Sequence, residues 1–250
     1  MPPRLLLMKN SVQIACTVLL CGWLVALPAQ ADRENFAAVA RVIDGYLQAT
    51  GGRPSLAAVE GLSASGTYKR FQRTWPMQWH RRQPNLSRLR VEQSRGIYVR
   101  LNDGDTLWEQ LPGDSRYLPL EARDAAVFEL ISTIVLPVVS RFESSQPITH
   151  LGVRTFEGQA VEILEYRNDS GVLQQLIFGE RSLLPVAVRQ SMPGETIFSQ
   201  TVRLTDYRAT GSIVLPHRIE VSREGWINEA ITVTQYTINQ GLFSNLFEVN

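Results

Sequence analysis

Three histidines, His80, His150 and His217, carry the side chains best suited to general acid–base work or to metal binding. They lie far apart in the sequence, and the chain contains no G-x-S-x-G elbow, no H-E-x-x-H motif and no P-loop. A zinc or triad site could still assemble from distant residues, but no local spacing favours one. We therefore expect each histidine to be a surface or turn residue, and we predict no catalytic residue, no metal, no cofactor and no enzyme activity.

The run Asn102-Asp103-Gly104-Asp105 is similar to the start of a calcium-binding loop. It lacks the acidic ligand that closes the full loop pattern, so a hairpin turn is the better interpretation. We expect this motif to join two strands rather than to hold an ion.

Apolar and polar side chains alternate along three neighbouring segments, residues 75–82, 88–91 and 97–101. Because successive side chains of a strand point to opposite faces, each segment presents one apolar face and one mostly cationic face. The residues expected on a common apolar face are Trp75, Met77, Trp79, Leu89, Val91, Ile97, Val99 and Leu101. Such a face either lines a lipid-binding cavity or packs onto an ordinary core, and methionine beside aromatic residues suits both.

The same region carries the strongest charge asymmetry of the chain. Residues 69–100 hold nine lysines or arginines and a single acid, Glu92, whereas the whole chain has 25 basic and 24 acidic residues. A solvated outer face explains this most simply, and an anionic partner surface, such as phospholipid headgroups or an acidic lipoprotein, is a second explanation. Aromatic residues among the cations also fit single-stranded nucleic acid. The export signal described below argues against that, so no nucleic-acid partner is predicted.

Hydrophobic periodicity defines the elements that must position these side chains. Apolar residues at helical spacing predict helices over residues 32–50 and 54–60, and a further helix over residues 121–141 that Pro137 kinks or ends. Segments between turn residues predict about eleven strands, over residues 64–73, 76–82, 86–93, 97–102, 106–111, 158–167, 172–178, 184–190, 196–207, 213–222 and 226–239.

These elements indicate a mainly β fold with two helical insertions. A sheet of about eleven strands curls, and it then either closes around packed side chains or leaves a hollow. We predict an incomplete antiparallel β-barrel that encloses a hydrophobic cavity, with the helices as plug or lid. The lid residues expected on the helix over 121–141 are Phe128, Ile131, Ile134 and Val135.

Residues 1–31 have the pattern of a cleaved secretory signal. A short basic start at Lys9 precedes an apolar run over residues 14–27, and a small-residue cleavage site ends at Ala31. We expect cleavage after Ala31 and a single periplasmic domain over residues 32–250. A membrane anchor is the alternative, although the apolar run barely reaches the length of a span.

Both cysteines of the chain, Cys16 and Cys21, lie inside this signal. Neither has the surroundings of a lipid attachment site. The expected mature chain therefore contains no cysteine, forms no disulfide and depends on its core for stability. Met8 remains an alternative start to Met1, because the signal is already complete from Met8 onwards.

Two motifs follow one another in the basic region: a basic-Pro-Asn strand over residues 80–90 and a D-G-x-x-L-W hairpin over residues 102–108. Their characteristic positions are Arg82, Pro84, Asn85, Asp103, Gly104 and Trp108. In this order and spacing they resemble the LolA/LolB lipoprotein-carrier superfamily. Residues 43–52, 206–216 and 236–247 are similar to outer-membrane lipoprotein-sorting relatives of that superfamily.

The resemblance implies an incomplete β-barrel whose helices close a cavity for the acyl chains of a lipoprotein, or for another lipid, in the periplasm. It implies an inner-membrane export complex and an outer-membrane acceptor as possible partners. One position departs from the pattern, because the family's cation directly before the Pro-Asn pair falls on Gln83. A relative that carries a different lipid or only senses one therefore stays open, as does a β-rich assembly or signalling protein of the envelope with a filled core.

Overall fold

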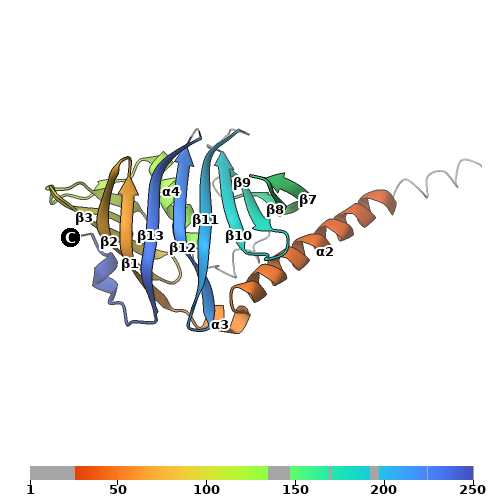
Figure 1. Ribbon diagram of the computed structural model, residues 1–250, viewed down its shortest axis with the longest axis horizontal. Helices are drawn as coiled ribbons and strands as arrows, with labels where there is room; N and C mark the ends of the chain where they lie inside the picture. The colour runs from red at the N-terminus through yellow and green to blue at the C-terminus, as the bar shows by residue number, and fades with distance from the viewer. Residues whose placement is uncertain (1–25, 135–146, 169–170, 192–196, 224, 250) are drawn as a thin grey trace, which may run out of the picture.

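Thirteen antiparallel strands form one open sheet in the order β6-β5-β4-β3-β2-β1-β13-β12-β11-β10-β9-β8-β7 (Figure 1). The computed structural model describes residues 26–134, 147–168, 171–191, 197–223 and 225–249. The strands are β1 Gly61–Arg70, β2 Arg73–Arg82, β3 Leu86–Gln93, β4 Gly96–Asn102, β5 Leu107–Gln110, β6 Leu118–Pro119, β7 Thr149–Phe156, β8 Gln159–Arg167, β9 Leu173–Gly179, β10 Pro185–Ser191, β11 Phe198–Thr210, β12 Ile213–Arg223 and β13 Trp226–Ile238.

The first and last strands pair with each other in the middle of the sheet. β1 lies beside β13, so the chain runs outward from β1 to the edge strand β6 and returns from the edge strand β7 to β13. The chain must therefore cross from one edge of the sheet to the other between β6 and β7. Helix α4, Ala122–Ile134, lies in this crossing and is seen behind the strands in Figure 1.

Helix α2, Ala26–Ala49, packs one apolar stripe against the sheet. Val42, Tyr46 and Leu47 are buried in the main hydrophobic cluster together with residues of α4 and of most strands. We call the face of the sheet that meets α2 and α4 the inner face.

No helix in the described part of the chain is both long and apolar enough to cross a membrane.

The end of α2 is set by a glycine whose position allows a close backbone approach. Gly51 has φ 122°, and a Cβ there would lie 2.3 Å from the carbonyl oxygen of Ser212 in the β11–β12 turn. Beside it, the amide of Val214 donates to the carbonyl of Thr50 at 3.0 Å. The short helix α3, Arg53–Ala57, follows and leads into β1.

The mainly β, antiparallel and open architecture is confirmed, but the strand count is too low. The sequence pattern missed β6, which has two residues, and β7, in which the register shifts between His150 and Val153. Gly152 has φ 77° at that shift, and the irregularity breaks the alternation on which strand prediction relies. α2 begins at Ala26 instead of residue 32, and residues 135–141 of the expected lid helix lie outside the described residues.

The expected common face of β3 and β4 is wrong. The turn between these strands pairs Gln93 with Gly96, so Leu89 lies opposite Arg100 and Val91 opposite Tyr98. Directly opposite residues share a face, which places Tyr98 and Arg100 on the inner face. The three apolar residues of β4 assigned to that face, Ile97, Val99 and Leu101, therefore lie on the outer face.

On that outer face, a second apolar cluster joins β4 to the C-terminal segment. Val99, Leu101 and Phe247 are buried together, and Phe247 belongs to the 3-10 helix η2, Ser244–Phe247. Ile97 is exposed. Val99 and Leu101 therefore attach the C-terminal segment to the sheet. Neither these two residues nor Ile97 contributes to the surface under α4.

Candidate functional site

The inner face carries a continuous apolar surface on β2 and β3. Met77 lies opposite Val91 and Trp79 opposite Leu89, and all four side chains are buried in the main cluster. Trp75 is partly buried at the margin of the same cluster. The alternation in these two strands therefore predicted their shared face correctly.

Helix α4 covers this apolar surface with its own apolar side chains. Val127, Phe128, Leu130 and Ile131 are buried in the same cluster as Met77 and Trp79. Phe128 and Ile131, two of the four residues expected on the lid, are thus buried between the helix and the sheet. The side chain of Ile134 is not described, and Val135 lies outside the described residues.

The first turn of α4 is tied to the sheet by charge. Asp124 accepts a hydrogen bond from the guanidinium of Arg223 on β12, and its other carboxylate oxygen lies 3.6 Å from the guanidinium of Arg100 on β4. An acidic residue in the first turn is also favoured by the helix dipole. One carboxylate therefore holds α4 to two strands.

The last described turn of α4 is tied by hydroxyl groups. The Oγ atoms of Ser132 and Ser87 lie 3.1 Å apart, and Ser87 Oγ accepts a hydrogen bond from Trp79 Nε1 at 2.9 Å. This chain connects the helix to β3 and β2 in a buried environment. α4 is thus fixed at both ends by polar contacts, while its middle contacts the sheet through apolar side chains.

A buried ion pair lies beside the first of these attachments. Both terminal nitrogens of Arg100 donate to Glu229 of β13, at 2.9 and 3.0 Å, and Arg100 Nε donates to Tyr98 Oη at 2.7 Å. Burial alone raises the pKa of Glu229, but the charge and hydrogen bonds of Arg100 outweigh it and hold that pKa below its ordinary value. Charge-assisted bidentate pairs of this kind are strong and directional.

Buried amides continue the polar line across the inner face. Tyr166 Oη donates to Gln174, Gln174 donates to Gln190 and Gln190 donates to Gln200, which lies opposite Arg223 on the neighbouring strand. We call the four residues from Tyr166 to Gln200 the glutamine row. With Arg223 and Asp124 it forms a polar line along one end of the inner face.

The family-motif positions hold turns together. Asn85 donates to the carbonyl of Gly104 at 2.7 Å, and one carboxylate oxygen of Asp103 accepts from Trp108 Nε1 at 2.7 Å. The other oxygen of Asp103 accepts from the amides of Asp105 and Thr106, which confirms a hairpin turn. Pro84 follows a cis peptide bond in the neighbouring turn.

Gln83 stands where the family pattern has a cation, and it makes a contact of its own. Its side-chain amide donates to the carbonyl of Val59 at 2.6 Å, and its backbone amide donates to Glu60 at 2.9 Å. The β2–β3 turn is thereby fixed to the segment between α3 and β1. Arg82 beside it donates to Ser244 Oγ at 2.8 Å.

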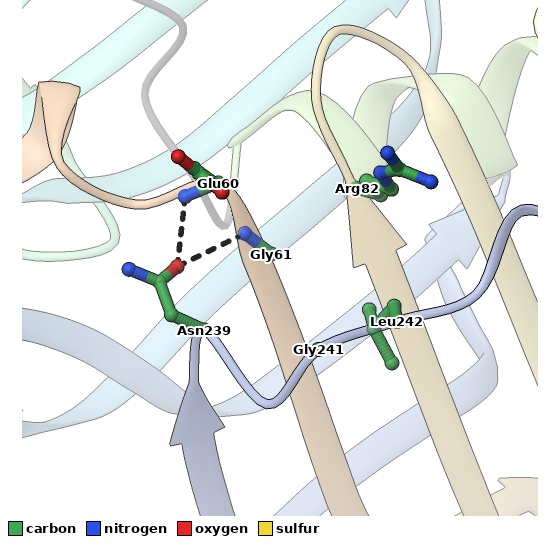
Figure 2. A pocket seen from close by; sticks show the side chains of 6 residues that line it. All are labelled: Glu60, Gly61, Arg82, Asn239, Gly241 and Leu242. Carbon is green, nitrogen blue, oxygen red and sulfur yellow. Dashed lines mark hydrogen bonds between the residues drawn. The ribbon is translucent and has the colours of Figure 1, made fainter.

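A pocket of about 220 Å³ lies next to Arg82 (Figure 2). Its other lining residues are Glu60, Gly61, Asn239, Gly241 and Leu242. The Asn239 side chain accepts hydrogen bonds from the amides of Glu60 and Gly61, as the dashed lines in Figure 2 show. These contacts fasten the end of β13 to the start of β1, away from the apolar surface under α4.

The three histidines lie on three different strands, and none is exposed. His217 is buried against Tyr236 and its Nδ1 lies 2.9 Å from the carbonyl of Val233, which corrects the expectation of surface or turn positions. His80 lies 3.0 Å from Ser63 Oγ; burial and the charge of Arg88 lower its pKa. His150 Nε2 lies within hydrogen-bond distance of the Glu162 carboxylate, which also accepts a hydrogen bond from Arg41 of α2. Among the residues described, no three His, Cys, Asp or Glu side chains gather as a metal site.

The sequence reasoning missed Arg100, Glu229 and Asp124, the charged residues beside the apolar surface. A signal for one of them existed, because Arg100 falls in a strand that is otherwise apolar between Tyr98 and Leu101. Glu229 lies 129 residues from Arg100 in the sequence, and only the pairing of the first strands with the last brings the two together.

The chain matches no protein-family model and no curated protein. Among solved structures, it is similar to a putative outer-membrane lipoprotein-sorting protein domain from Vibrio parahaemolyticus, with 15% identity, a TM-score of 0.56 and coverage of 86% of this chain and 97% of that one. A DUF1329 family protein from Desulfovibrio piger matches with 12% identity, a TM-score of 0.54 and coverage of 84% and 97%.

A LolA superfamily protein from Nitrosomonas europaea matches with 13% identity, a TM-score of 0.51 and coverage of 75% of this chain and 89% of that one. At such low identity the likeness concerns the fold alone. The chain therefore has the fold of LolA superfamily proteins and of outer-membrane lipoprotein-sorting domains.

Proposed function

We propose that the protein binds the acyl chains of a lipoprotein, or of another lipid, between helix α4 and the inner face of the sheet, as a carrier without catalytic activity. One observation carries this proposal: α4 covers the apolar surface of β2 and β3 with apolar side chains and is held by polar contacts at its two ends. The acyl-contacting residues in this proposal are Met77, Trp79, Leu89, Val91, Phe128 and Ile131.

This arrangement suits a lid because an acyl chain can replace the apolar contacts between α4 and the sheet. When α4 moves away, the apolar surfaces of the helix and the sheet become exposed. An acyl chain that enters between them buries these surfaces again and contributes about 0.8 kcal/mol of favourable free energy for each methylene it buries. The polar contacts lie at the ends of the helix, and when they break, Arg100, which lies opposite Leu89, keeps its pair with Glu229. The amides of the glutamine row and the guanidinium of Arg223 lie along one end of the inner face and can donate hydrogen bonds to the ester or amide carbonyls of a lipid.

Export fits the same proposal. Residues 1–31 act as a cleaved signal, Asp32 begins the mature chain, and the carrier works in the periplasm between an inner-membrane donor and an outer-membrane acceptor. The absence of cysteine from residues 32–250 agrees with a chain that needs no disulfide after export. The fold shared with a lipoprotein-sorting domain and a LolA superfamily protein supports the same class of cargo.

A second candidate function is an envelope assembly or signalling protein with a permanently filled core. It is favoured by the close contact of α4 with the sheet, since the side chains of Phe128 and Trp79 are both almost completely buried there. In that case α4 is part of the core and has no lid function.

Native mass spectrometry of protein purified from the periplasm separates the two candidates. A carrier retains additional mass in steps that correspond to acyl chains, and organic extraction removes it. The same spectrum gives the N-terminus, which we expect at Asp32 without an acyl group. Protein of bare polypeptide mass that also fails to bind a fluorescent sixteen-carbon fatty acid in titration contradicts the carrier function.

A further inference from the structure

Exposed apolar side chains gather at one end of the sheet, on the tips of neighbouring hairpins. Phe71 lies in the β1–β2 turn and is 69% exposed, while Trp226 and Ile227 begin β13 and are 79% and 56% exposed. The two tips are adjacent, because β1 pairs with β13 and the amide of Phe71 donates to the carbonyl of Asn228 at 3.2 Å. Both turns lie along the upper rim of the sheet in Figure 1.

Phe71 occupies a backbone conformation that its side chain does not favour. Its φ is 55°, in the left-handed region where glycine and asparagine are normal and a bulky residue is an outlier. The ring is exposed, so burial does not compensate the strain, and the guanidinium of Arg70 lies 5.8 Å from the ring centroid. Phe71 therefore presents an aromatic ring to solvent at a turn position whose backbone favours a smaller residue.

Trp226 is also a large apolar residue at an exposed hairpin position. It follows Gly225, whose φ of 84° shapes the turn, and it lies opposite Arg223 at the start of β13. A tryptophan exposed in this way presents a large apolar surface to water, although a small polar residue would serve a hairpin equally well. Tryptophan with an apolar body and a polar N–H is the side chain typical of a membrane–water interface.

Cations surround the two tips. Lys69, Arg70 and Arg73 flank Phe71 in the sequence, and Arg95 is exposed in the β3–β4 turn at the same end of the sheet. The buried Glu229 pairs with Arg100 and also lies 3.9 Å from Arg70, and the exposed Glu92 of β3 pairs with Arg90. Apolar tips between cations complement a surface that is apolar inside and anionic outside, which is the interface of a bilayer with acidic phospholipids.

We propose that the rim formed by Phe71, Trp226 and Ile227, together with Lys69 and Arg73, inserts into the interface of an anionic phospholipid bilayer. This inference goes beyond the proposed function, since it concerns the surface on which the protein docks and does not depend on acyl binding. The rim lies at the end of the sheet where Asp124 and Arg223 hold the first turn of α4, so a bilayer at the rim would meet the helix at its charged attachment.

Vesicle flotation tests this proposal with two kinds of vesicle, phosphatidylethanolamine with phosphatidylglycerol at about 3:1, and phosphatidylcholine alone. We expect the intact protein to float with the anionic vesicles and to lose most of this binding at high salt. The double variant Phe71→Asn with Trp226→Ser should bind about tenfold or more weakly, because two interfacial apolar side chains are gone. Asparagine accepts the left-handed backbone at position 71, so the variant should melt no lower than the intact protein.

A matched control uses the opposite end of the molecule. Phe243 is as exposed as Trp226, at 79%, and lies beside Leu242, which lines the pocket at the start of β1. Phe243→Ser should leave flotation unchanged. Quenching of Trp226 fluorescence by brominated phospholipid should appear with the intact protein and disappear in Trp226→Phe.

Two results would overturn the proposal. In the first, the double variant floats like the intact protein. In the second, the intact protein binds neither kind of vesicle, which would indicate that the rim binds a protein partner instead. Fatty-acid titration without vesicles is run on the same preparations. Because the rim variants should leave that titration unchanged, failure of the rim and failure of acyl binding are distinguished.

Discussion

Asp124 in the first turn of α4 accepts a hydrogen bond from Arg223 near the end of β12, although the two residues lie 99 positions apart. The same carboxylate faces Arg100, which is itself bound by Glu229 of β13. The first turn of α4 is therefore attached to the sheet through one side chain, which can be changed without altering the apolar side chains beneath the helix. This makes Asp124 the most informative position for testing whether α4 moves.

Replacing Asp124 by asparagine should loosen the helix and leave the fold intact. The variant loses charge-assisted contacts to two arginines, so we expect the free energy of unfolding to fall by about 1 to 2 kcal/mol. The rate at which a fluorescent fatty acid loads should rise several-fold, measured by stopped-flow fluorescence.

Asp206→Asn is the matched control, because Asp206 pairs with the exposed Arg208 on β11 and its replacement makes the same change in charge. It should alter neither the loading rate nor, to any marked extent, stability. An unchanged loading rate in Asp124→Asn would exclude Asp124 as the attachment that limits entry.

The buried pair of Glu229 and Arg100 predicts acid sensitivity. Because the folded-state pKa of Glu229 lies below its ordinary value of 4.5, the unfolded chain takes up the proton first as pH falls. The stabilisation is thus complete above about pH 4.5 and is lost as the pH falls through the folded-state pKa. Urea unfolding between about pH 6 and pH 3 measures this loss.

Glu229→Gln removes the titrating group and leaves Arg100 without its main partner. We expect a loss of about 3 kcal/mol or more at neutral pH and a flatter pH profile below about pH 4.5. The control Glu92→Gln removes an exposed carboxylate from β3 and should keep the profile of the intact protein. A Glu229→Gln profile as steep as that of the intact protein would show that another group causes the acid sensitivity.

Trp79→Glu distinguishes a lipid cavity from a packed core. If α4 is a lid, water can reach position 79 when the helix opens, so folding should weaken only modestly while acyl binding is lost. In a filled core the unpaired charge costs several kcal/mol and the protein unfolds or fails to accumulate. Melting curves and a fatty-acid titration on one preparation give both quantities.

Leu101→Glu serves as the comparison for Trp79→Glu. Leu101 is equally buried but lies in the outer cluster with Phe247, where no opening is expected. Leu101→Glu should strongly lower the melting temperature. The fraction of this variant that does fold should bind acyl chains with the affinity of the intact protein. Equal and large losses of melting temperature in the two variants would favour the filled core.

Local patterns predicted the elements and the apolar face of β2 and β3 because both depend on residues close in sequence. Trp75, Met77 and Trp79 alternate within one strand, and Phe128 and Ile131 recur within one helix. The face of β4 was predicted wrongly because it depends on how the two-residue turn after Gln93 sets the pairing, which alternation within each strand does not contain.

The charged attachments could not be predicted for a different physical reason. Arg100, Asp124, Arg223 and Glu229 come from β4, α4, β12 and β13, and they meet because β1 pairs with β13 and the chain crosses between the edges of the sheet. Composition along the sequence indicated a cationic outer face for β4. The structure instead buries Arg100 on the inner face, where Glu229 compensates its charge.

Locking α4 onto the sheet tests the central claim most directly. Ser87 of β3 and Ser132 of α4 have their Oγ atoms 3.1 Å apart, so cysteines at both positions are placed to form a disulfide. Residues 32–250 contain no cysteine, so the new pair supplies the only thiols of the mature protein. We predict that the oxidised Ser87→Cys, Ser132→Cys protein melts at or above the reduced form and does not take up fatty acid, and that reduction restores uptake. Equal uptake by the oxidised and reduced forms would contradict the account of α4 as the lid of a lipid-binding site.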